Sequence, residues 1–237
     1  MLAAGLAAGR RPQAVFVVEG TPAAVEAAEA GPADPLASLP LTLVTRRVAE
    51  KITTLETPPS VMAVFPALRP PPLAALRSDG LLAVYADHIA DPGNLGTLVR
   101  AAAAFGAAAL IASPDCVDLF SPKVVRAGMG AVFSVPLYAG VQLKRALGKL
   151  APVHSYGLVA HGGADLATAP LALPAVVCVG AERAGLADDV AALLDEKLTI
   201  RLAPGAAAVE SLNAGVAGAI ALYEFSRRAA ETTTAGV

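Results

Sequence analysis

Three polar stretches interrupt the apolar part of the chain after residue 80, and each follows a run of residues that predicts a β-strand. The first stretch, residues 91–100, reads Asp-Pro-Gly-Asn-Leu-Gly-Thr-Leu-Val-Arg. Its apolar periodicity predicts a helix that begins near Asn94, for which Asn94 is a candidate N-cap. Arg100 then lies inside a helix that is otherwise apolar. Because a lone buried guanidinium is costly unless it faces an anion, Arg100 indicates a cleft that accommodates negative charge.

The second stretch, residues 179–186, contains two glycines and Glu182. Glycines at a strand end let the backbone approach a ligand closely, and Glu182 could bind a ligand hydroxyl or hold a basic partner. The third stretch, residues 204–213, precedes an amphipathic helix. Ser211 and Asn213 either cap this helix or, with the backbone N–H groups of the loop, meet a polar ligand. Taken singly, the second and third stretches are equally compatible with ordinary turns.

The elements that must position these stretches alternate between apolar runs and helical periodicity. The runs are continuous, which is typical of strands buried on both faces of a parallel sheet. We expect helices at 95–105 and 212–228 and strands at 81–86, 108–112, 132–137, 155–160, 175–179 and 198–202. This alternation predicts a doubly wound α/β domain, in which ligands bind at the carboxyl ends of the strands.

A proline-rich segment, residues 66–80, separates this domain from a shorter part of the chain. Prolines at this density favour an extended connector. We therefore predict a small α/β domain at 1–65, a linker at 66–80 and a larger domain at 81–237. In the small domain we expect helices at 23–30 and 46–51 and strands at 14–18, 41–44 and 61–65.

The absence of their sequence motifs excludes several other kinds of site. The sequence contains no Rossmann fingerprint, Walker loop, H-E-x-x-H or G-x-S-x-G. No Cys or His pair has ligand spacing, so we expect no metal. Cys116 and Cys178 lie in apolar runs, as core residues of a reducing compartment do. Since we find neither a signal peptide nor an apolar run of about 18 residues, we expect a cytoplasmic protein without a membrane span.

The charge balance is slightly acidic, with a net charge of −2, and aromatic residues make up 4% of the chain. A surface of stacked aromatics, as in many single-strand RNA binders, is therefore not expected. One segment differs, because residues 119–164 contain no Asp or Glu. Its basic residues could contact RNA phosphates, although charge alone favours a solvated surface balanced by acids from elsewhere. They are Lys123, Arg126, Lys144, Arg145 and Lys149.

The three stretches together are more specific than any one of them. In this order, they resemble the signature motifs of the SpoU/TrmH family of RNA methyltransferases, in the SPOUT class. The first motif is an Asn followed six residues later by Arg, the second is Gly-x-Glu-x-x-Gly-Leu, and the third is Glu-Ser-Leu-Asn-x-x-Val-Ala. Residues 121–130 resemble the family's stretch between the first two motifs. Residues 1–65 resemble its ribosomal-protein-like substrate-binding domain, which we expect to be truncated at its start.

The chain departs from the family pattern at four positions. The family has a bulkier residue at Gly93, Ser at Gly128, Asn at Ala181 and Gly at Ala207. None of these differences removes a candidate site residue, so they bear on the substrate more than on the reaction.

The resemblance implies a parallel-sheet domain with a deep trefoil knot near its carboxyl end, in which the second and third motifs hold S-adenosyl-L-methionine. The implied cofactor positions are Gly180, Glu182, Leu186, Ile200, Leu202, Ser211 and Leu212. The implied catalytic positions are Arg100, Asn94, Glu182, Ser211 and Asn213. The implied reaction is methyl transfer to a ribose 2′-hydroxyl of rRNA, or of tRNA. Because an arginine stays protonated, we interpret Arg100 as stabilising the developing oxyanion.

The family also implies a homodimer, in which Arg100 of one chain faces the cofactor of the other. The helix at 212–228 is apolar on two sides, which favours a partner on each. Two alternatives stay open: a non-catalytic RNA-binding or assembly protein on the same scaffold, and a methyltransferase acting on a base or a protein. Arg100 and Asn213 argue against the first, since neither is needed for packing. The target nucleotide, and a housekeeping or antibiotic-resistance role, also stay open.

Overall fold

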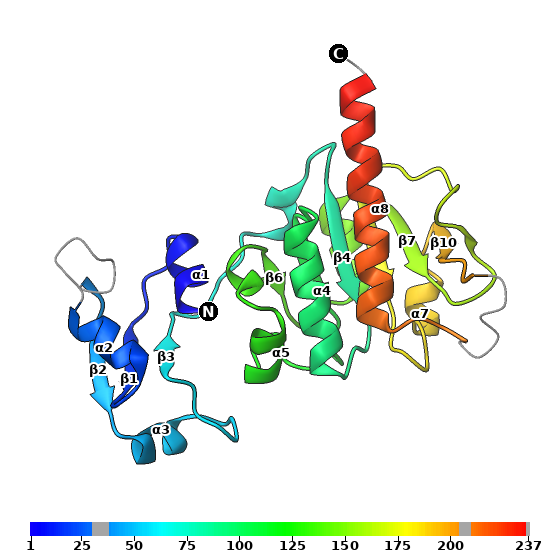
Figure 1. Ribbon diagram of the computed structural model, residues 1–237. Helices are drawn as coiled ribbons and strands as arrows, with labels where there is room; N and C mark the ends of the chain where they lie inside the picture. The colour runs from blue at the N-terminus through cyan, green and yellow to red at the C-terminus, as the bar shows by residue number, and fades with distance from the viewer. Residues whose placement is uncertain (30–37, 204–209, 236–237) are drawn as a thin grey trace. The chain divides into compact units, whose positions relative to one another are not determined.

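The structure is a computed structural model that describes residues 1–29, 38–203 and 210–235. The chain divides into two compact units, Met1–Leu68 and Arg69–Val237 (Figure 1). The boundary between the units falls inside the proline-rich segment 66–80.

The smaller unit is built on a three-stranded sheet. Its elements are α1 (Leu2–Ala7), β1 (Ala14–Val18), α2 (Pro22–Glu29), β2 (Leu41–Val44), α3 (Arg46–Ile52) and β3 (Val61–Val64). The central strand β1 pairs parallel with β2 and antiparallel with β3. A small buried cluster of Val18, Val44 and Ala49 packs beneath the sheet. The last residue of the helix expected at 23–30 lies outside the described residues.

The larger unit carries a seven-stranded sheet. Its strands are β4 (Leu82–Ala86), β5 (Ala109–Ala112), β6 (Leu137–Tyr138), β7 (His154–Leu158), β8 (Ala164–Asp165), β9 (Ala175–Val179) and β10 (Glu196–Thr199). Its helices are α4 (Pro92–Ala104), α5 (Pro122–Ala127), α6 (Leu143–Leu150), α7 (Asp188–Ala191) and α8 (Ala214–Ala235), with 3₁₀ turns η2 (Leu73–Leu76) and η3 (Ala131–Phe133).

The strands follow the order β6-β5-β4-β9-β7-β10-β8, and every pair of neighbours is parallel. The predicted parallel sheet is thereby confirmed. The direction of strand succession reverses between β4 and β9, where Val84 lies opposite Val177. In sheets of this type ligands bind beyond the carboxyl ends of the strands near such a switch point. The trefoil knot that the family resemblance implies stays a prediction.

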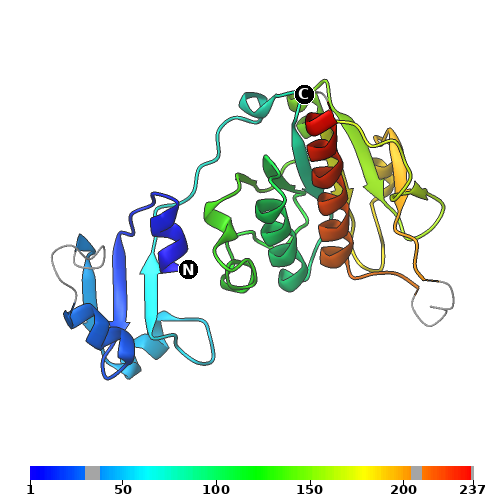
Figure 2. The same ribbon diagram turned by 45° about the horizontal axis from the view of Figure 1, so that its top comes forward.

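Helices cover both faces of the sheet, as the continuous apolar strands predicted. On one face Leu82, Val84 and Ala86 of β4 pack in a core with residues of α4, α5 and α8. On the other face Ala83 and Tyr85 pack with residues of α6. Helices α4 and α8 lie side by side on the first face (Figures 1 and 2).

Two strand predictions were wrong in detail. The strand expected at 132–137 is the 3₁₀ turn η3 followed by the two-residue strand β6. Gly130, with φ 94°, turns the chain before this segment, and Pro136 has no N–H to give to a sheet ladder. The strand expected at 198–202 is β10, which ends at Thr199, so the residues after it leave the sheet. The short strand β8 was not predicted.

Helices α4 and α5 approach each other closely at Gly96. A Cβ atom added there would lie 2.9 Å from the backbone oxygen of Val124 and would collide with the side chain of Ala127. Gly148 in α6 is the opposite case, because a Cβ atom there would meet nothing within 4 Å.

We predict opposite effects of alanine at these two glycines. Gly96→Ala should lower the free energy of unfolding by about 1–3 kcal/mol, because α5 must move to make room. Gly148→Ala, the matched control, should leave it unchanged or raise it by up to about 1 kcal/mol through helix propensity. Urea unfolding followed by circular dichroism measures both. A Gly96→Ala protein as stable as the wild type would mean that α4 and α5 do not pack this closely.

Candidate cofactor and catalytic site

A cavity of about 340 Å³ opens at the carboxyl ends of β7, β9 and β10. Its volume is in the range of small-molecule sites, roughly 300–1,000 Å³. Described residues of the second and third motifs line it, and residues 204–209 of the third motif lie outside the described part of the chain. The seven cofactor positions that the family resemblance implies all line this one cavity: Gly180, Glu182, Leu186, Ile200, Leu202, Ser211 and Leu212.

The second motif forms a tight loop after β9 that explains its glycine spacing. Ala181 and Gly185 exchange two backbone hydrogen bonds, with N–O distances of 3.0 and 2.9 Å. Gly185 has φ +70°, which glycine adopts without strain. A Cβ atom at Gly180 would collide with the backbone of Gly185 and Leu186. Both glycines are therefore required for the loop to fold back on itself beside the cavity.

A cluster of three polar side chains joins the three motifs, and one of the three, Glu182, lines this cavity. The Oε1 atom of Glu182 accepts hydrogen bonds from Asn94 Nδ2 at 2.8 Å and from Asn213 Nδ2 at 2.6 Å. Asn213 Nδ2 also donates to Asn94 Oδ1 at 2.7 Å. Asn94 is only 6% exposed, whereas Asn213 lies at the surface. We call Asn94, Glu182 and Asn213 the Asn–Glu–Asn cluster.

Local helix chemistry sets the two asparagines in place. The prediction of Asn94 as N-cap was wrong, because Asp91 caps α4 by accepting from the backbone N of Asn94 at 2.8 Å. Pro92 occupies the first turn, where a missing N–H costs nothing. The Asn94 side chain is thereby left to reach Glu182. Asn213 does cap α8, as predicted, because its Oδ1 accepts from Val216 N at 3.1 Å.

Arg100 does not occupy the environment that its sequence context suggested. It is exposed on α4, because the helix turns Leu98, Val99 and Ala101 toward the core and Arg100 away from it. The prediction of a buried guanidinium was therefore wrong. Arg100 does not line the cavity of its own chain, and within the described ranges it makes no hydrogen bond or ion pair. Ser211 is exposed at the cavity and caps nothing that the structure describes.

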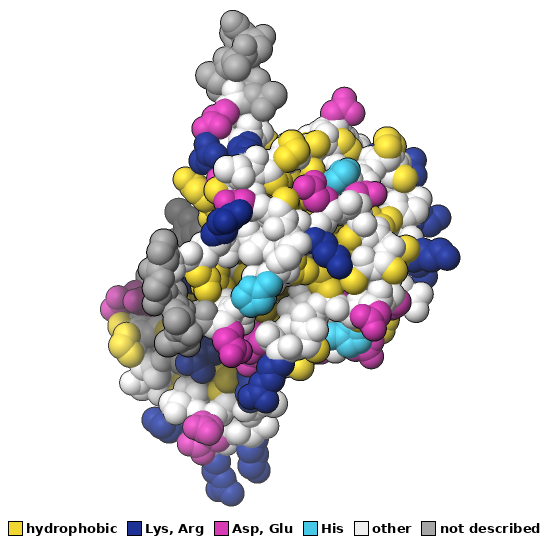
Figure 3. Space-filling view, turned by 90° about the vertical axis from the view of Figure 1, so that its right-hand side faces the viewer, with side chains coloured by type: hydrophobic (Ala, Val, Ile, Leu, Met, Phe, Trp, Pro, Cys, Tyr) yellow, Lys and Arg dark blue, Asp and Glu magenta, His cyan; other side chains and the backbone are white. Residues whose placement is uncertain are grey.

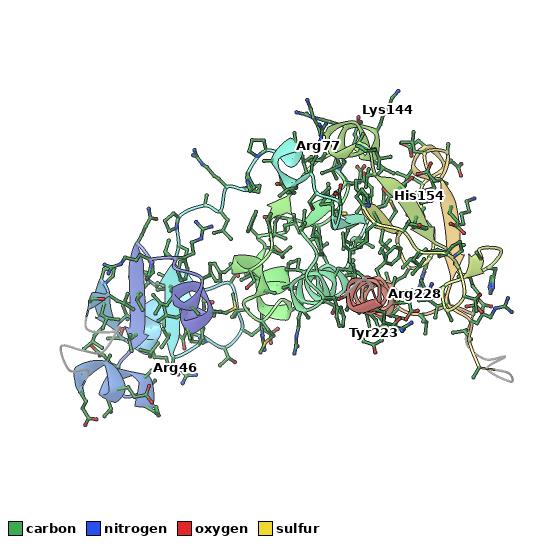
Figure 4. All side chains as sticks on the ribbon, turned by 90° about the horizontal axis from the view of Figure 1, so that it is seen from above. Arg46, Arg77, Lys144, His154, Tyr223 and Arg228 are labelled. Carbon is green, nitrogen blue, oxygen red and sulfur yellow. The ribbon has the colours of Figure 1, made fainter. Side chains whose placement is uncertain are left out.

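The basic residues of the acid-free segment lie on two separate helices. Lys123 and Arg126 are exposed on α5, on the same sheet face as α4 and α8. The other three are exposed on α6, on the opposite face: Lys144, Arg145 and Lys149. Figure 4 shows Lys144 beside Arg77 on one side of the sheet and Tyr223 of α8 on the other. The five residues therefore do not form one surface, and their contact with RNA stays a prediction.

The side of the larger unit that carries β10 has charges of both signs interspersed (Figure 3). No group of three or more metal-ligating side chains occurs among the described residues. The described helices also include none that is long and apolar enough to span a membrane.

The two cysteines offer no nucleophile at the site. Burial raises the pKa of the Cys178 thiol, and the nearby Asp87 adds to this effect, so Cys178 stays protonated. The Cys116 Sγ atom donates a hydrogen bond to the backbone oxygen of Ala86 at 3.3 Å. Covalent catalysis by a thiolate, which would suit attack on a base, therefore has no candidate at this cavity.

Sequence reasoning missed part of the cavity wall. Leu158, Val159 and Ala160 line it from the end of β7, where the pair Gly162-Gly163 was an available signal of close backbone approach. Charged residues outside the motifs also line it, namely Asp188 and Lys197.

Comparison with known proteins agrees with this geometry. The SpoU rRNA methylase family model matches residues 81–223. An uncharacterised tRNA/rRNA methyltransferase of Synechocystis is 34% identical over 203 residues, which cover 82% of this chain and 70% of the relative. The 23S rRNA (uridine(2479)-2′-O)-methyltransferase of Streptomyces viridochromogenes is 32% identical over 189 residues, which cover 76% of this chain and 64% of the relative.

A solved structure shows the same fold over both units. The AdoMet-bound rRNA methyltransferase from Sinorhizobium meliloti superposes with a TM-score of 0.76 at 30% identity, covering 96% of this chain and 84% of that chain. This chain belongs to the SpoU rRNA methylase family. The family and enzyme class predicted from the three motifs are confirmed, and the AdoMet-bound neighbour supports the predicted cofactor.

We predict that the Asn–Glu–Asn cluster depends on an acceptor at position 182. Glu182→Ala should lower the free energy of unfolding by about 1–3 kcal/mol, because the nearly buried Asn94 amide loses its partner. Glu182→Gln keeps an oxygen that can accept both bonds but loses the charge that strengthens them, so its loss of stability should be about half that of Glu182→Ala or less. Urea unfolding measures the differences.

Glu210→Ala is the control for the Glu182 variants. Glu210 lines the same cavity and makes no hydrogen bond with any described residue, so its loss should not change stability. If Glu182→Ala were as stable as Glu210→Ala, the cluster would not hold the three motifs together.

Proposed function

We propose that this protein transfers the methyl group of S-adenosyl-L-methionine to a ribose 2′-hydroxyl of ribosomal RNA. The observation that carries the proposal is the Asn–Glu–Asn cluster, which joins all three family motifs at a cavity lined by the seven expected cofactor positions. The printed activity of the Streptomyces relative supports the 2′-oxygen as acceptor. Transfer RNA is the second candidate substrate, because the Synechocystis relative is described for both.

The charges of the cavity suit this cofactor. When bound, S-adenosylmethionine supplies an electrophilic methyl group on a positive sulfonium. Three acids line the cavity and provide negative charge for a sulfonium and an ammonium group: Glu182, Asp188 and Glu210. Lys197 also lines it and can pair with a carboxylate. The apolar walls formed by Leu158, Leu186 and Ile200 suit a flat ring system.

In a homodimer, the partner chain supplies the Arg100 side chain that the cavity lacks within its own chain. One side of α8 is buried in its own domain through Ala221, Leu222 and Phe225. The other side exposes Val216, Ile220 and Tyr223, which are 44%, 38% and 53% exposed. The predicted two apolar sides of this helix are thus present, and among the described residues one side is buried while the other stays partly exposed. A second copy that packs by a self-complementary contact is the commonest partner for such a surface.

The dimer also gives Arg100 a role that its own chain does not. Arg100 is exposed on α4, the helix that packs beside α8, so a partner on the outer face of α8 lies near it. In the dimer Arg100 faces the cavity of the partner and stabilises the ribose oxygen as it loses its proton to solvent or a neighbouring phosphate. Preorganised charge of this kind contributes about 10²–10³ in rate.

The remaining parts of the chain bind RNA. The unit that precedes the linker is the substrate-binding domain, at residues 1–65. Of the five basic residues, Lys123 and Arg126 are the stronger candidates, because α5 packs against the helix that carries Arg100. The enzyme works in the cytoplasm, where free thiols such as Cys116 and Cys178 stay reduced. A non-catalytic RNA-binding protein and a methyltransferase acting on a base or a protein are the alternatives that the experiments below distinguish.

We predict that the acceptor is the 2′-oxygen. Sequencing rRNA and tRNA from cells with and without the gene, after alkaline hydrolysis, should identify one protected nucleotide, because a 2′-O-methyl group blocks cleavage. A synthetic RNA with a 2′-deoxy residue at that nucleotide should accept no methyl group, since the acceptor atom is missing. The same RNA with an unmodified ribose is the control. Continued methylation of the deoxy RNA at that nucleotide would show that a base is the acceptor.

We predict that each active site uses two chains. Arg100→Ala should abolish transfer and leave cofactor binding unchanged, because Arg100 does not line its own cavity. Gly180→Ala should abolish cofactor binding, because its Cβ collides with the loop backbone. A purified heterodimer of the two variants should recover about half of the wild-type rate, since one site then has both intact parts.

Differently tagged chains, co-expressed and purified through both tags, provide this heterodimer. The two mutant homodimers are the controls, and each should be inactive. A folded heterodimer that binds cofactor but transfers no methyl group would assign Arg100 and the cofactor loop to the same chain.

A further inference from the structure

Asp87 is a fully buried carboxylate that the reaction described above does not use. It follows β4 directly and is 0% exposed, at the switch point between β4 and β9. A buried carboxylate is costly unless hydrogen bonds or an opposite charge compensate it. Its contacts therefore indicate what it holds in place.

The contacts of Asp87 bracket the second-motif loop. Its backbone N donates to the oxygen of Val179, the last residue before the loop, at 2.8 Å. Its Oδ2 atom accepts from the backbone N of Ala187, the first residue after the loop, at 2.8 Å. Both ends of the segment 180–186 are thus tied to one residue, which directly follows the neighbouring strand β4.

The second of these bonds sets the position of cavity residues. Leu186, which precedes Ala187, lines the cavity, and so does Asp188, which follows it. Ala187 is also the N-cap of α7. Because Leu186 and Asp188 flank Ala187, a shift of the distal end of the loop moves the cavity wall.

His88 completes the arrangement on the other carboxylate oxygen. Its Nδ1 atom lies 2.8 Å from Asp87 Oδ1, and its Nε2 atom lies 3.3 Å from Asp115 Oδ2. The hydrogen bond to Asp87 is the largest cause that raises the pKa of His88. The backbone N of His88 is held by Ser113 Oγ at 3.0 Å. Asp87 is thereby fixed from one side while its Oδ2 faces the loop.

We infer that Asp87 is a positioning residue for cofactor binding: its buried carboxylate fixes the distal end of the second-motif loop and so the shape of the cavity. This inference rests on the proposed function, because it takes S-adenosylmethionine as the ligand of that cavity. Asp87 touches neither cofactor nor RNA. Its loss acts through the affinity for the cofactor and leaves binding of RNA unchanged.

Calorimetry with S-adenosylmethionine on the full-length protein tests this inference. Asp87→Ala should weaken cofactor binding by about tenfold or more, the effect of losing one hydrogen bond to a charged group. Asp87→Asn keeps an oxygen that can accept from Ala187 N and should bind within about threefold of the wild type. At saturating cofactor Asp87→Ala should regain most of the wild-type kcat, so the defect lies in KM.

Cys116→Ala is the matched control. The Cys116 Sγ atom accepts from Ile89 N at 3.3 Å, so this variant loosens the same β4–α4 connection without touching the second-motif loop. It should bind S-adenosylmethionine as the wild type does. Equal losses in Cys116→Ala and Asp87→Ala would attribute the effect to general loosening and overturn the inference.

A second variant covers the case in which Asp87→Ala does not fold. Ala187→Pro removes the same hydrogen bond from the loop side, and the Ala187 φ of −62° already suits proline. It should show the same loss of cofactor affinity. Wild-type affinity in either folded variant would overturn the role of Asp87 and leave the proposed function intact. Failure of the wild-type protein itself to bind S-adenosylmethionine would instead overturn the proposed function.

Discussion

The double hydrogen bond that Glu182 accepts from Asn94 and Asn213 is the contact on which the rest of the site depends. These residues come from the start of α4, the loop after β9 and the start of α8, which are distant in sequence. One carboxylate oxygen facing two amide groups fixes the ends of two helices relative to the loop. Charge-assisted bonds of this kind are stronger than neutral ones, so the cluster adds to the packing of Leu186 in holding the loop.

The sheet supplies the frame for this contact. Strands β4 and β9 are buried on both faces, so their carboxyl ends have fixed positions. The second-motif loop leaves β9 at that edge and returns at Ala187, where Asp87 meets it. The family model matches residues 81–223, a region that contains both strands, helix α4 and the first part of α8.

The pattern of apolar and polar residues predicted the elements whose formation depends on their own local sequence. The strands β4, β5 and β9 and the helix α8 follow from apolar runs and helical periodicity, whereas the seven cavity positions came from the resemblance to the family. The face of a helix on which a residue lies, and the contacts between distant parts of the chain, were harder to predict from the sequence. Asp91 competed with Asn94 as the cap, Arg100 fell on the outer face of α4, and Gly130 and Pro136 prevented a long strand at β6. The partner of Asp87 is a backbone amide far along the chain, which no spacing in one sequence reveals.

A crystal structure of the protein with S-adenosylmethionine would test the central claim most directly. The cofactor should lie in the cavity at the carboxyl ends of β7, β9 and β10, against Gly180, Leu186 and Leu212. Glu182 should still accept from both asparagines, and the Arg100 side chain of a second copy should face the cofactor. A cofactor bound elsewhere, or a cavity in which Glu182 has released Asn94 and Asn213, would contradict the claim that this cluster organises the site.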